Sequence, residues 1–375
     1  PEPIVPGLPI DPGGPPYLHD PETDAEFKEK AVEVVRYSAL LDPSDGVSVD
    51  ISPATWGNAP LGTNDRAGHE FNPWTSLPYE PVMVPRADFG RVLAEFWADG
   101  PDSETPPGHW NTLANAVTDH PAFEPRLGGA GELVDQLEWD VKMYLALNGA
   151  VHDAAVAAWG AKGHYDYVRP ISMIRWMGGL GQSSDPSLPS YHPDGLPLIA
   201  GEVELITTET AAAGGRHEHL DDFVGEIAIR AWAGNPGDTG SELGGVDWIR
   251  AVEWVPYQLS TFVTPSFAGY VSGHSTFSRA AAEVLTQMTG SPYFPGGLGT
   301  WTVPAGSLHF ELGPSVDVPL QGATYSDAAD QAGLSRLSGG IHVEADDLRG
   351  RVMGSQCGVD AWTTAQRYWD GTARG

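Results

Sequence analysis

Three short motifs, far apart in the chain but in a fixed order, are the feature that most constrains the fold. They span Lys162 to Pro170, Ser272 to His274, and Ser335 to Asp346. The positions specified by residue type and spacing are Lys162, Arg169, Pro170, Ser272, Gly273, His274, Ser335, Arg336, Gly340, His342 and Asp346. These side chains can act together only if the three segments converge, so we expect no domain boundary between them.

The residue types in the motifs suit a tetrahedral oxyanion. Arg169 and Arg336 carry planar guanidinium groups that can each grip two oxygens, and Lys162 adds a compact positive charge. Ser272 and Gly273 add neutral donors, and the apolar run after Gly273 predicts that a helix begins there. The N-terminus of a helix favours an anion further.

These motifs resemble those of the vanadium-dependent haloperoxidases, which share their site with the acid phosphatases of the phosphatidic acid phosphatase type 2 superfamily. Because of their order and separations, the resemblance extends from about Glu95 to the end of the chain and identifies a bacterial-type member. It implies an all-α fold, a helical bundle with long loops and a small hairpin. It also implies that vanadate is the cofactor, with Lys162, Arg169, Ser272, Gly273, Arg336 and His342 holding it.

The resemblance assigns separate roles to the two histidines. His342 would bond the vanadium and Asp346, four residues on, would fix its tautomer. His274 would act as general acid and base, and Lys162 would stabilise charge on the oxygen that is transferred. The prediction is oxidation of bromide, with chloride as a second candidate, by hydrogen peroxide to hypohalous acid. An organic compound could then accept the halogen.

Two other functions fit the same residues. An acid phosphatase would use His342 as a nucleophile and form a phosphohistidine. A non-catalytic anion-binding module would bind the same oxyanion without turnover. The aromatic residues favour the haloperoxidase, because Trp159 and Phe267 match positions that shape the halide side of its pocket. Asp99, in a segment that also resembles haloperoxidases, is predicted to pair with Arg336.

A second metal candidate lies near the N-terminus. The segment from Asp42 to Asp50 carries oxygen ligands suitable for calcium, but it lacks the spacing and terminal glutamate of an EF-hand. An ordinary turn is therefore favoured there over a calcium site.

The charge balance limits the partners. Fifty acidic side chains against twenty basic ones give a net charge of −30, which argues against nucleic acid or an anionic membrane as a partner. It also fits a secreted protein kept soluble in salty water. The single Cys357 cannot form an internal disulfide, and the sequence contains no apolar run long enough for a membrane span. A homo-oligomer is compatible with all of these features.

The chain divides into two expected parts. Residues 1–20 are rich in proline and predict an extended arm, and residues 21–375 predict a single helical catalytic domain. A Gly- and Pro-rich stretch over residues 296–322 predicts a loop or small hairpin. Apolar spacing predicts helices over residues 24–41, 85–97, 131–159, 274–288, 326–337 and 343–367.

Overall fold

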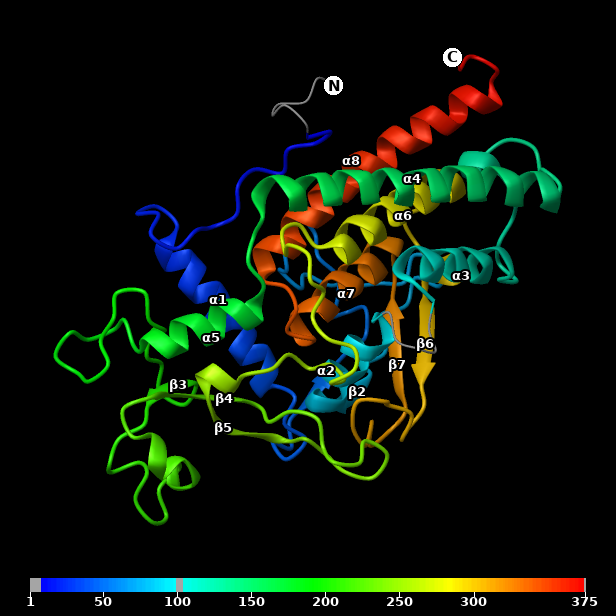
Figure 1. Ribbon diagram of the computed structural model, residues 1–375. Helices are drawn as coiled ribbons and strands as arrows, with labels where there is room; N and C mark the ends of the chain where they lie inside the picture. The colour runs from blue at the N-terminus through cyan, green and yellow to red at the C-terminus, as the bar shows by residue number, and fades with distance from the viewer. Residues whose placement is uncertain (1–7, 99–103, 374–375) are drawn as a thin grey trace.

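The computed structural model describes residues 8–98 and 104–373, and helices dominate it (Figure 1). The α-helices are α1 (Asp24–Ala39), α2 (Arg86–Phe96), α3 (Pro106–Thr118), α4 (Gln136–Tyr165), α5 (Pro170–Leu180), α6 (Gly273–Thr289), α7 (Tyr325–Ser338) and α8 (Glu344–Trp369). Short 3₁₀ turns are η1 (Leu127–Gly129), η2 (Glu218–Phe223), η3 (Ala251–Glu253) and η4 (Pro295–Gly297). The fold is thus the helical bundle that the sequence predicts.

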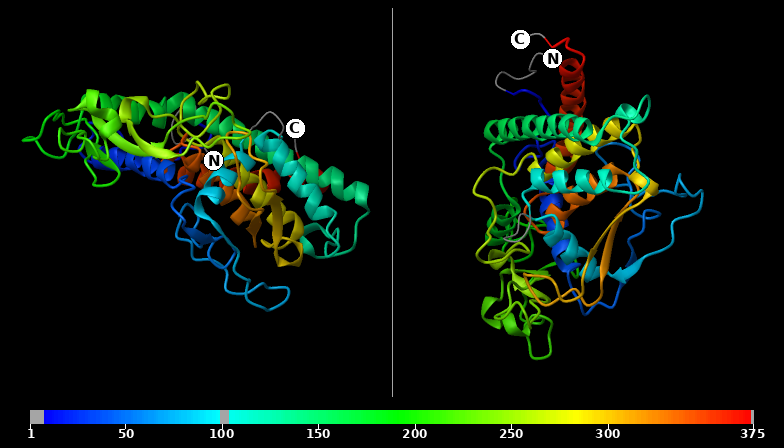
Figure 2. Two further views of the ribbon diagram at one scale, coloured as in Figure 1. Left: turned by 90° about the horizontal axis from the view of Figure 1, so that it is seen from below. Right: turned by 90° about the vertical axis from the view of Figure 1, so that its right-hand side faces the viewer.

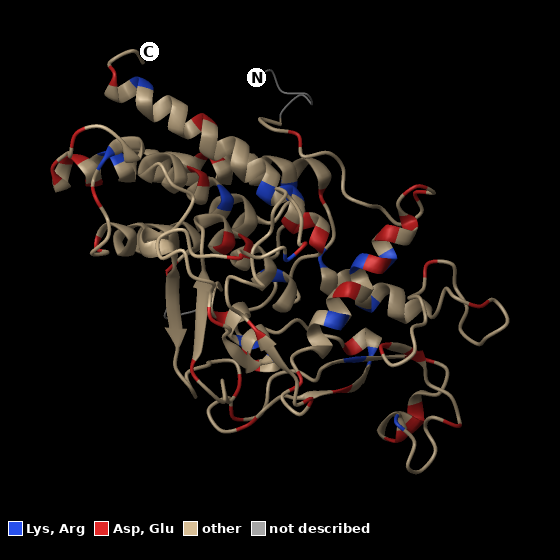
Figure 3. Cartoon of the chain, turned by 180° about the vertical axis from the view of Figure 1, so that it is seen from behind, with Lys and Arg blue, Asp and Glu red and all other residues tan. Residues whose placement is uncertain are grey.

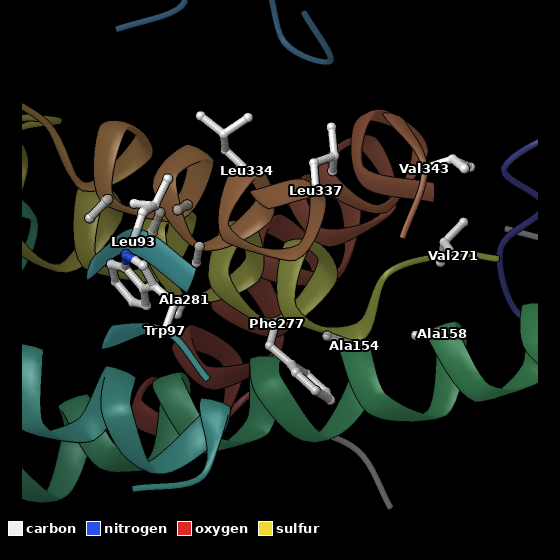
Figure 4. Packing of buried hydrophobic residues seen from close by; sticks show 14 of the residues in the cluster. Leu93, Trp97, Ala154, Ala158, Val271, Phe277, Ala281, Leu334, Leu337 and Val343 are labelled. Atoms are coloured by element: carbon white, nitrogen blue, oxygen red, sulfur yellow. The ribbon is translucent and has the colours of Figure 1, made fainter. Parts of the chain in front are cut away.

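Helix α6 is the centre of the bundle, and α4, α7 and α8 pack around it. Small side chains such as Ala154 of α4 and Ala281 of α6 keep the helices close, while Phe277 and Leu337 fill the spaces between them (Figure 4). Figure 2 shows long loops projecting away from this bundle. The core therefore surrounds the one helix whose N-terminus carries the second motif.

Glycines spaced by four residues bring α8 against α6. A Cβ at Gly354 would overlap the Thr276 carbonyl oxygen, and one at Gly358 would lie 2.6 Å from the Ala280 carbonyl oxygen. Only glycine allows this backbone approach. As a result the N-termini of the two helices lie side by side, with the Ser272 N–H donating to the Asp346 carbonyl at 2.9 Å.

Small antiparallel sheets lie outside the bundle. Strand β6 pairs with β7 and confirms the hairpin expected within residues 296–322, whereas the three-stranded sheet β3–β4–β5 beside α5 was not predicted (Figure 1). The strands are β1 (Ser48–Asp50), β2 (Met83–Pro85), β3 (Val203–Leu205), β4 (Ile227–Trp232), β5 (Val246–Arg250), β6 (Gly299–Val303) and β7 (Val318–Gly322).

Helix α4 differs from its predicted range at both ends. It begins at Gln136, after the Asp135 side chain accepts the Glu138 N–H at 3.0 Å, and it runs on to Tyr165. The prediction stopped at Trp159 because polar residues interrupt the apolar pattern beyond it, yet Lys162 is buried. Among the described residues, none of the helices has the length and apolar character needed to cross a membrane.

The calcium candidate folds as a turn held by arginines. The Asp42 carboxylate accepts the Ser44 N–H and pairs with Arg230 at 2.7 Å, and Asp45 pairs with Arg86 at 2.7 Å. Since both carboxylates already have a cationic partner, the geometry supports the ordinary turn over the calcium site.

Candidate active site

The corner between α4 and α5 supplies two cations. Asp166 ends α4 in a left-handed conformation with φ 44°, and Pro170 starts α5 directly after Arg169. Proline suits the first helical position because the N–H it lacks would have no helical partner. Lys162 and Arg169 are only 3% and 6% exposed. The two residues therefore point into the protein although they belong to different helices.

Both cations donate to the segment that precedes α6. Lys162 Nζ donates to the carbonyls of Ala268 at 2.9 Å and Gly269 at 2.7 Å. Arg169 donates through Nε to the Phe267 carbonyl at 3.1 Å and through Nη1 to the Ile341 carbonyl at 2.9 Å. These bonds fix the orientation of the two side chains.

The second motif forms the N-terminus of α6, as predicted. Ser272 is the N-cap, and its Oγ accepts the Ser275 N–H at 3.3 Å. At Gly273 a Cβ would lie 3.2 Å from the Trp159 ring, closer than side chains normally pack. Since Lys162 Nζ lies 5.7 Å from the centroid of the same Trp159 ring, the N-terminus of α6 lies near the cation from α4.

His342 is anchored by the carboxylate predicted to orient it. Its Nδ1 lies 2.7 Å from Asp346 Oδ2, which also accepts the Val343 N–H at 3.2 Å. Its Nε2 lies 3.1 Å from Nη1 of Arg169. An arginine can only donate, so Nε2 carries a lone pair and Nδ1 carries the proton. Asp346 therefore sets the tautomer that leaves Nε2 available as a ligand atom.

The loop before His342 requires a glycine. Gly340 has φ +73°, and a Cβ there would lie 3.1 Å from the Trp254 ring. A side chain would be strained by the backbone and crowded by the ring. This turn lets the chain leave α7 and present His342 just before α8 begins.

Arg336 of α7 meets His274 of α6. Nη1 of Arg336 lies 3.4 Å from Nε2 of His274, and Nη2 donates to the Ala94 carbonyl at 3.3 Å. His274 also hydrogen-bonds to the Trp97 backbone. The end of α2 therefore supports both residues, which the sequence did not reveal because backbone acceptors leave no residue-type signal. The predicted pair between Asp99 and Arg336 lies outside the described residues.

Aromatic rings flank the cations. The ring centroids of Trp159 and Phe267 are 5.1 Å apart, and Lys162 Nζ lies 5.4 Å from the Phe267 centroid. The two rings are 44% and 42% exposed. Next to Phe267 and Arg169 opens a cavity of about 1030 Å³, with mainly apolar walls that include Val255 and Leu259. A mainly apolar cavity thus adjoins the cationic site at Arg169 and Phe267.

Burial dominates the electrostatics of the site. It lowers the pKa of Lys162 to about 7, helped by Arg169, and the pKa of Arg169 to about 10. It raises the pKa of Asp346 to about 7, and it holds the pKa of His342 and His274 well below 6.5. An oxyanion here would favour the charged cations. The donor set and the neutral His342 therefore fit vanadate.

The structure brings together all but one of the predicted site residues, in one region formed by α4, α5, α6, α7 and the start of α8. The residues gathered there are Trp159, Lys162, Arg169, Phe267, Ser272, Gly273, His274, Arg336, His342 and Asp346. Their chemical roles remain predictions.

Comparison with known proteins identifies the family. The protein-family model described as the VCPO second helical-bundle domain matches residues 142–371, more than half of the chain. The chain therefore belongs to the vanadium haloperoxidase family. No curated protein sequence matches it.

Solved structures of the same class share the fold. The apo form of a bacterial vanadium-dependent chloroperoxidase is 19% identical, with a TM-score of 0.58 over 97% of this chain and 54% of that one. For the holo form of a bacterial vanadium-dependent chloroperoxidase the identity is 18% and the TM-score 0.55, over 96% and 52%. The chain thus spans about half the length of these relatives.

Proposed function

We propose that this protein is a vanadate-dependent haloperoxidase that uses hydrogen peroxide to oxidise bromide, and also chloride, to hypohalous acid. The observation that carries the proposal is the geometry of His342. Its Nδ1–H is held by Asp346 at 2.7 Å, and its Nε2 lone pair faces a cluster of buried cations. This is the tautomer that a metal-bonding histidine requires.

The remaining motif residues hold the oxyanion. Lys162, Arg169 and Arg336 supply charge-assisted donors, and the N-terminus of α6 adds backbone N–H groups from Gly273. When bound, vanadate would act as a Lewis acid that activates peroxide for attack by halide. For His342 to bond it, Arg169 Nη1 must release Nε2 and turn to an oxyanion oxygen.

His274 is proposed as the general acid and base. Burial and Arg336 hold its pKa well below 6.5, so the ring is neutral near pH 7 and can accept a proton from peroxide. Its position 3.4 Å from Arg336 links it to a group that holds the anion. The proton could then be returned to a departing oxygen.

Halide and an organic acceptor are proposed to approach along the aromatic side. Trp159 and Phe267 are partly exposed, so their rings can cover a weakly hydrated anion while Lys162 lies within 6 Å of both centroids, at 5.7 and 5.4 Å. The cavity beside Phe267 has room for a small organic molecule. Secretion and a homo-oligomeric state remain predictions from the sequence.

The test is halide oxidation by metal-stripped protein with and without orthovanadate. Peroxide, bromide or chloride, and a halogen-trapping dye would be supplied, with phosphate-ester hydrolysis run in parallel. We expect vanadate-dependent halogenation that His342→Ala abolishes and His152→Ala preserves, because His152 is exposed on α4. Ester hydrolysis that vanadate inhibits, without halogenation, would instead establish the phosphatase.

A further inference from the structure

A segment without helix or strand at the start of the described chain packs against the end of α4 and the tyrosines that flank the first two motifs. We call residues 8–16 the strap. Leu8 is only 1% exposed, and a Cβ at Gly160 of α4 would lie 3.4 Å from Pro9 and 3.7 Å from Leu8. The strap therefore lies against the last turns of α4, the helix that carries Lys162.

Three tyrosine hydroxyls fasten the strap. Tyr165 donates to Asp11 Oδ1 at 2.6 Å, Tyr270 to the Gly13 carbonyl at 2.6 Å, and Tyr167 to the Pro16 carbonyl at 2.8 Å. The rings also pack edge to face. The centroid of the Tyr270 ring lies 5.3 Å from that of Tyr165 and 6.1 Å from that of Tyr167. The strap thus bonds at three separate points to one aromatic group.

Each of these tyrosines lies two or three positions in sequence from a residue of the pocket. Tyr165 follows Lys162 by three residues, and Tyr270 precedes Ser272 by two. The Tyr167 carbonyl accepts the Gly269 N–H at 2.9 Å, and the Gly269 carbonyl in turn accepts Lys162 Nζ at 2.7 Å. One strap is therefore connected both to the first motif and to the segment that leads into the second.

We propose that the strap holds the first and second motifs in register and so preorganises the oxyanion pocket, with Tyr167 and Tyr270 as positioning residues. The proposal rests on the proposed function only in that the pocket binds an oxyanion. Donors fixed in place before the ligand arrives cost less to order on binding. Removing the hydrogen bonds of the strap should therefore weaken oxyanion binding, whereas an equally destabilising substitution elsewhere in the protein should not.

The experiment compares single hydroxyl deletions in the full chain. Tyr167→Phe, Tyr270→Phe and the double variant would be titrated with orthovanadate and with inorganic phosphate by calorimetry, without peroxide or halide. Tyr79→Phe is the matched control, because its hydroxyl is also buried and donates to a backbone carbonyl, that of Gly297, at 2.7 Å. Melting temperatures would be measured for all variants.

We expect the double variant to bind both oxyanions at least about fivefold more weakly, which corresponds to ~1 kcal/mol of binding free energy. Tyr79→Phe should lose similar stability without any change in affinity. Asp11→Ala should weaken binding, and Asp11→Asn, which keeps an acceptor oxygen, should restore it. Unchanged affinity in the double variant, or equal weakening in Tyr79→Phe, would overturn the proposal.

The readout separates this proposal from the haloperoxidase function. If the wild type halogenates but the strap variants keep their oxyanion affinity, only the strap proposal is wrong. If halogenation is absent but the variants bind vanadate or phosphate more weakly, only the haloperoxidase function fails. A wild type that binds neither oxyanion overturns both.

Discussion

Lys162 is the residue in which burial and charge conflict most directly. It is 3% exposed and lies beside Arg169, and its pKa falls to about 7. A buried cation is costly unless a negative partner compensates it, and Asp346 is the carboxylate that raises this pKa. Lys162 is thus better placed to bind an anion than to stabilise the folded protein. Its type and spacing revealed it in the sequence, whereas its carbonyl partners in residues 268–269 left no pattern to detect.

Phe267 is predicted to influence which halide is oxidised. Replacing it with histidine admits water and puts a ring nitrogen beside Lys162 that can accept its N–H. Both draw the lysine away from the transferred oxygen, which weakens the oxidant. Chloride is harder to oxidise than bromide, so Phe267→His should lower the chloride-to-bromide ratio of kcat/KM roughly tenfold, which corresponds to ~1.4 kcal/mol. Steady-state rates with each halide measure this ratio.

The control for this substitution is Phe71→His. Phe71 is 48% exposed in the connection between β1 and β2, so the same chemical change there should leave the ratio as in the wild type. An unchanged ratio in Phe267→His would show that its ring does not shape the halide side.

At the scale of elements, apolar periodicity located both ends of α1, α2, α6, α7 and α8 to within two residues. It missed α3 and α5. Both begin with proline, at Pro106 and Pro170, which interrupts a pattern although it fits the first helical turn. The short strands β3 and β5 escaped because three to five residues are too few to establish alternation. The close approach of α8 to α6 depends on glycines, which carry no apolar signal.

Glu95 connects α2 to the loop between β6 and β7. Its carboxylate accepts the N–H groups of His309 at 2.7 Å and Phe310 at 3.1 Å, and the Tyr257 hydroxyl at 3.2 Å. Burial raises its pKa from 4.5 to about 7, despite these bonds and with a smaller contribution from Glu311. The next residue toward the N-terminus is Ala94, whose carbonyl supports Arg336. Glu95 therefore makes the end of α2 sensitive to pH.

The sign of the effect follows from the raised pKa. The folded state binds this proton more tightly than the unfolded state, so the contribution to stability is full below pH 4.5 and is lost as pH rises through 7. We expect the unfolding free energy of the wild type, relative to Glu95→Gln, to fall by about 2–3 kcal/mol between pH 5 and about pH 8. Urea titrations at several pH values would measure it.

Taking the difference between the two proteins cancels the contributions of other carboxyls whose pKa is raised, such as Glu33, Asp330 and Asp346, because these are present in both proteins. If the unfolding free energies of the wild type and Glu95→Gln change in parallel with pH, Glu95 does not titrate in this range.

For the whole molecule, the sequence predicted convergence of the motifs better than it predicted architecture. Chemistry requires Lys162, His274 and His342 to meet, and the structure brings their segments together within one bundle. The sequence could not predict the elements outside the bundle, such as the β3–β4–β5 sheet, because no catalytic chemistry fixes the residue types in them. The division into an arm of residues 1–20 and a domain of residues 21–375 stays a prediction.

The net charge of −30 belongs to the whole molecule, and Figure 3 shows acidic residues spread over the loops and outer helices. Like charges repel in the compact state and less so in the unfolded chain, and salt screens them with a Debye length of ~10 Å at 0.1 M. We therefore expect the unfolding free energy to rise by about 1 kcal/mol or more between ~0.02 and ~0.3 M sodium chloride. Urea denaturation would measure it.

Screening and halide binding both predict stabilisation by sodium chloride, so the series must be repeated with sodium acetate. Equal gains in the two salts identify screening, whereas a gain confined to chloride identifies binding at the site. A fall in stability with salt would mean that ion pairs outweigh repulsion. Buried pairs such as Arg91 with Glu311, where each side chain is at most 2% exposed, are screened little. The repulsion among exposed acidic groups is thus the contribution that salt should change most.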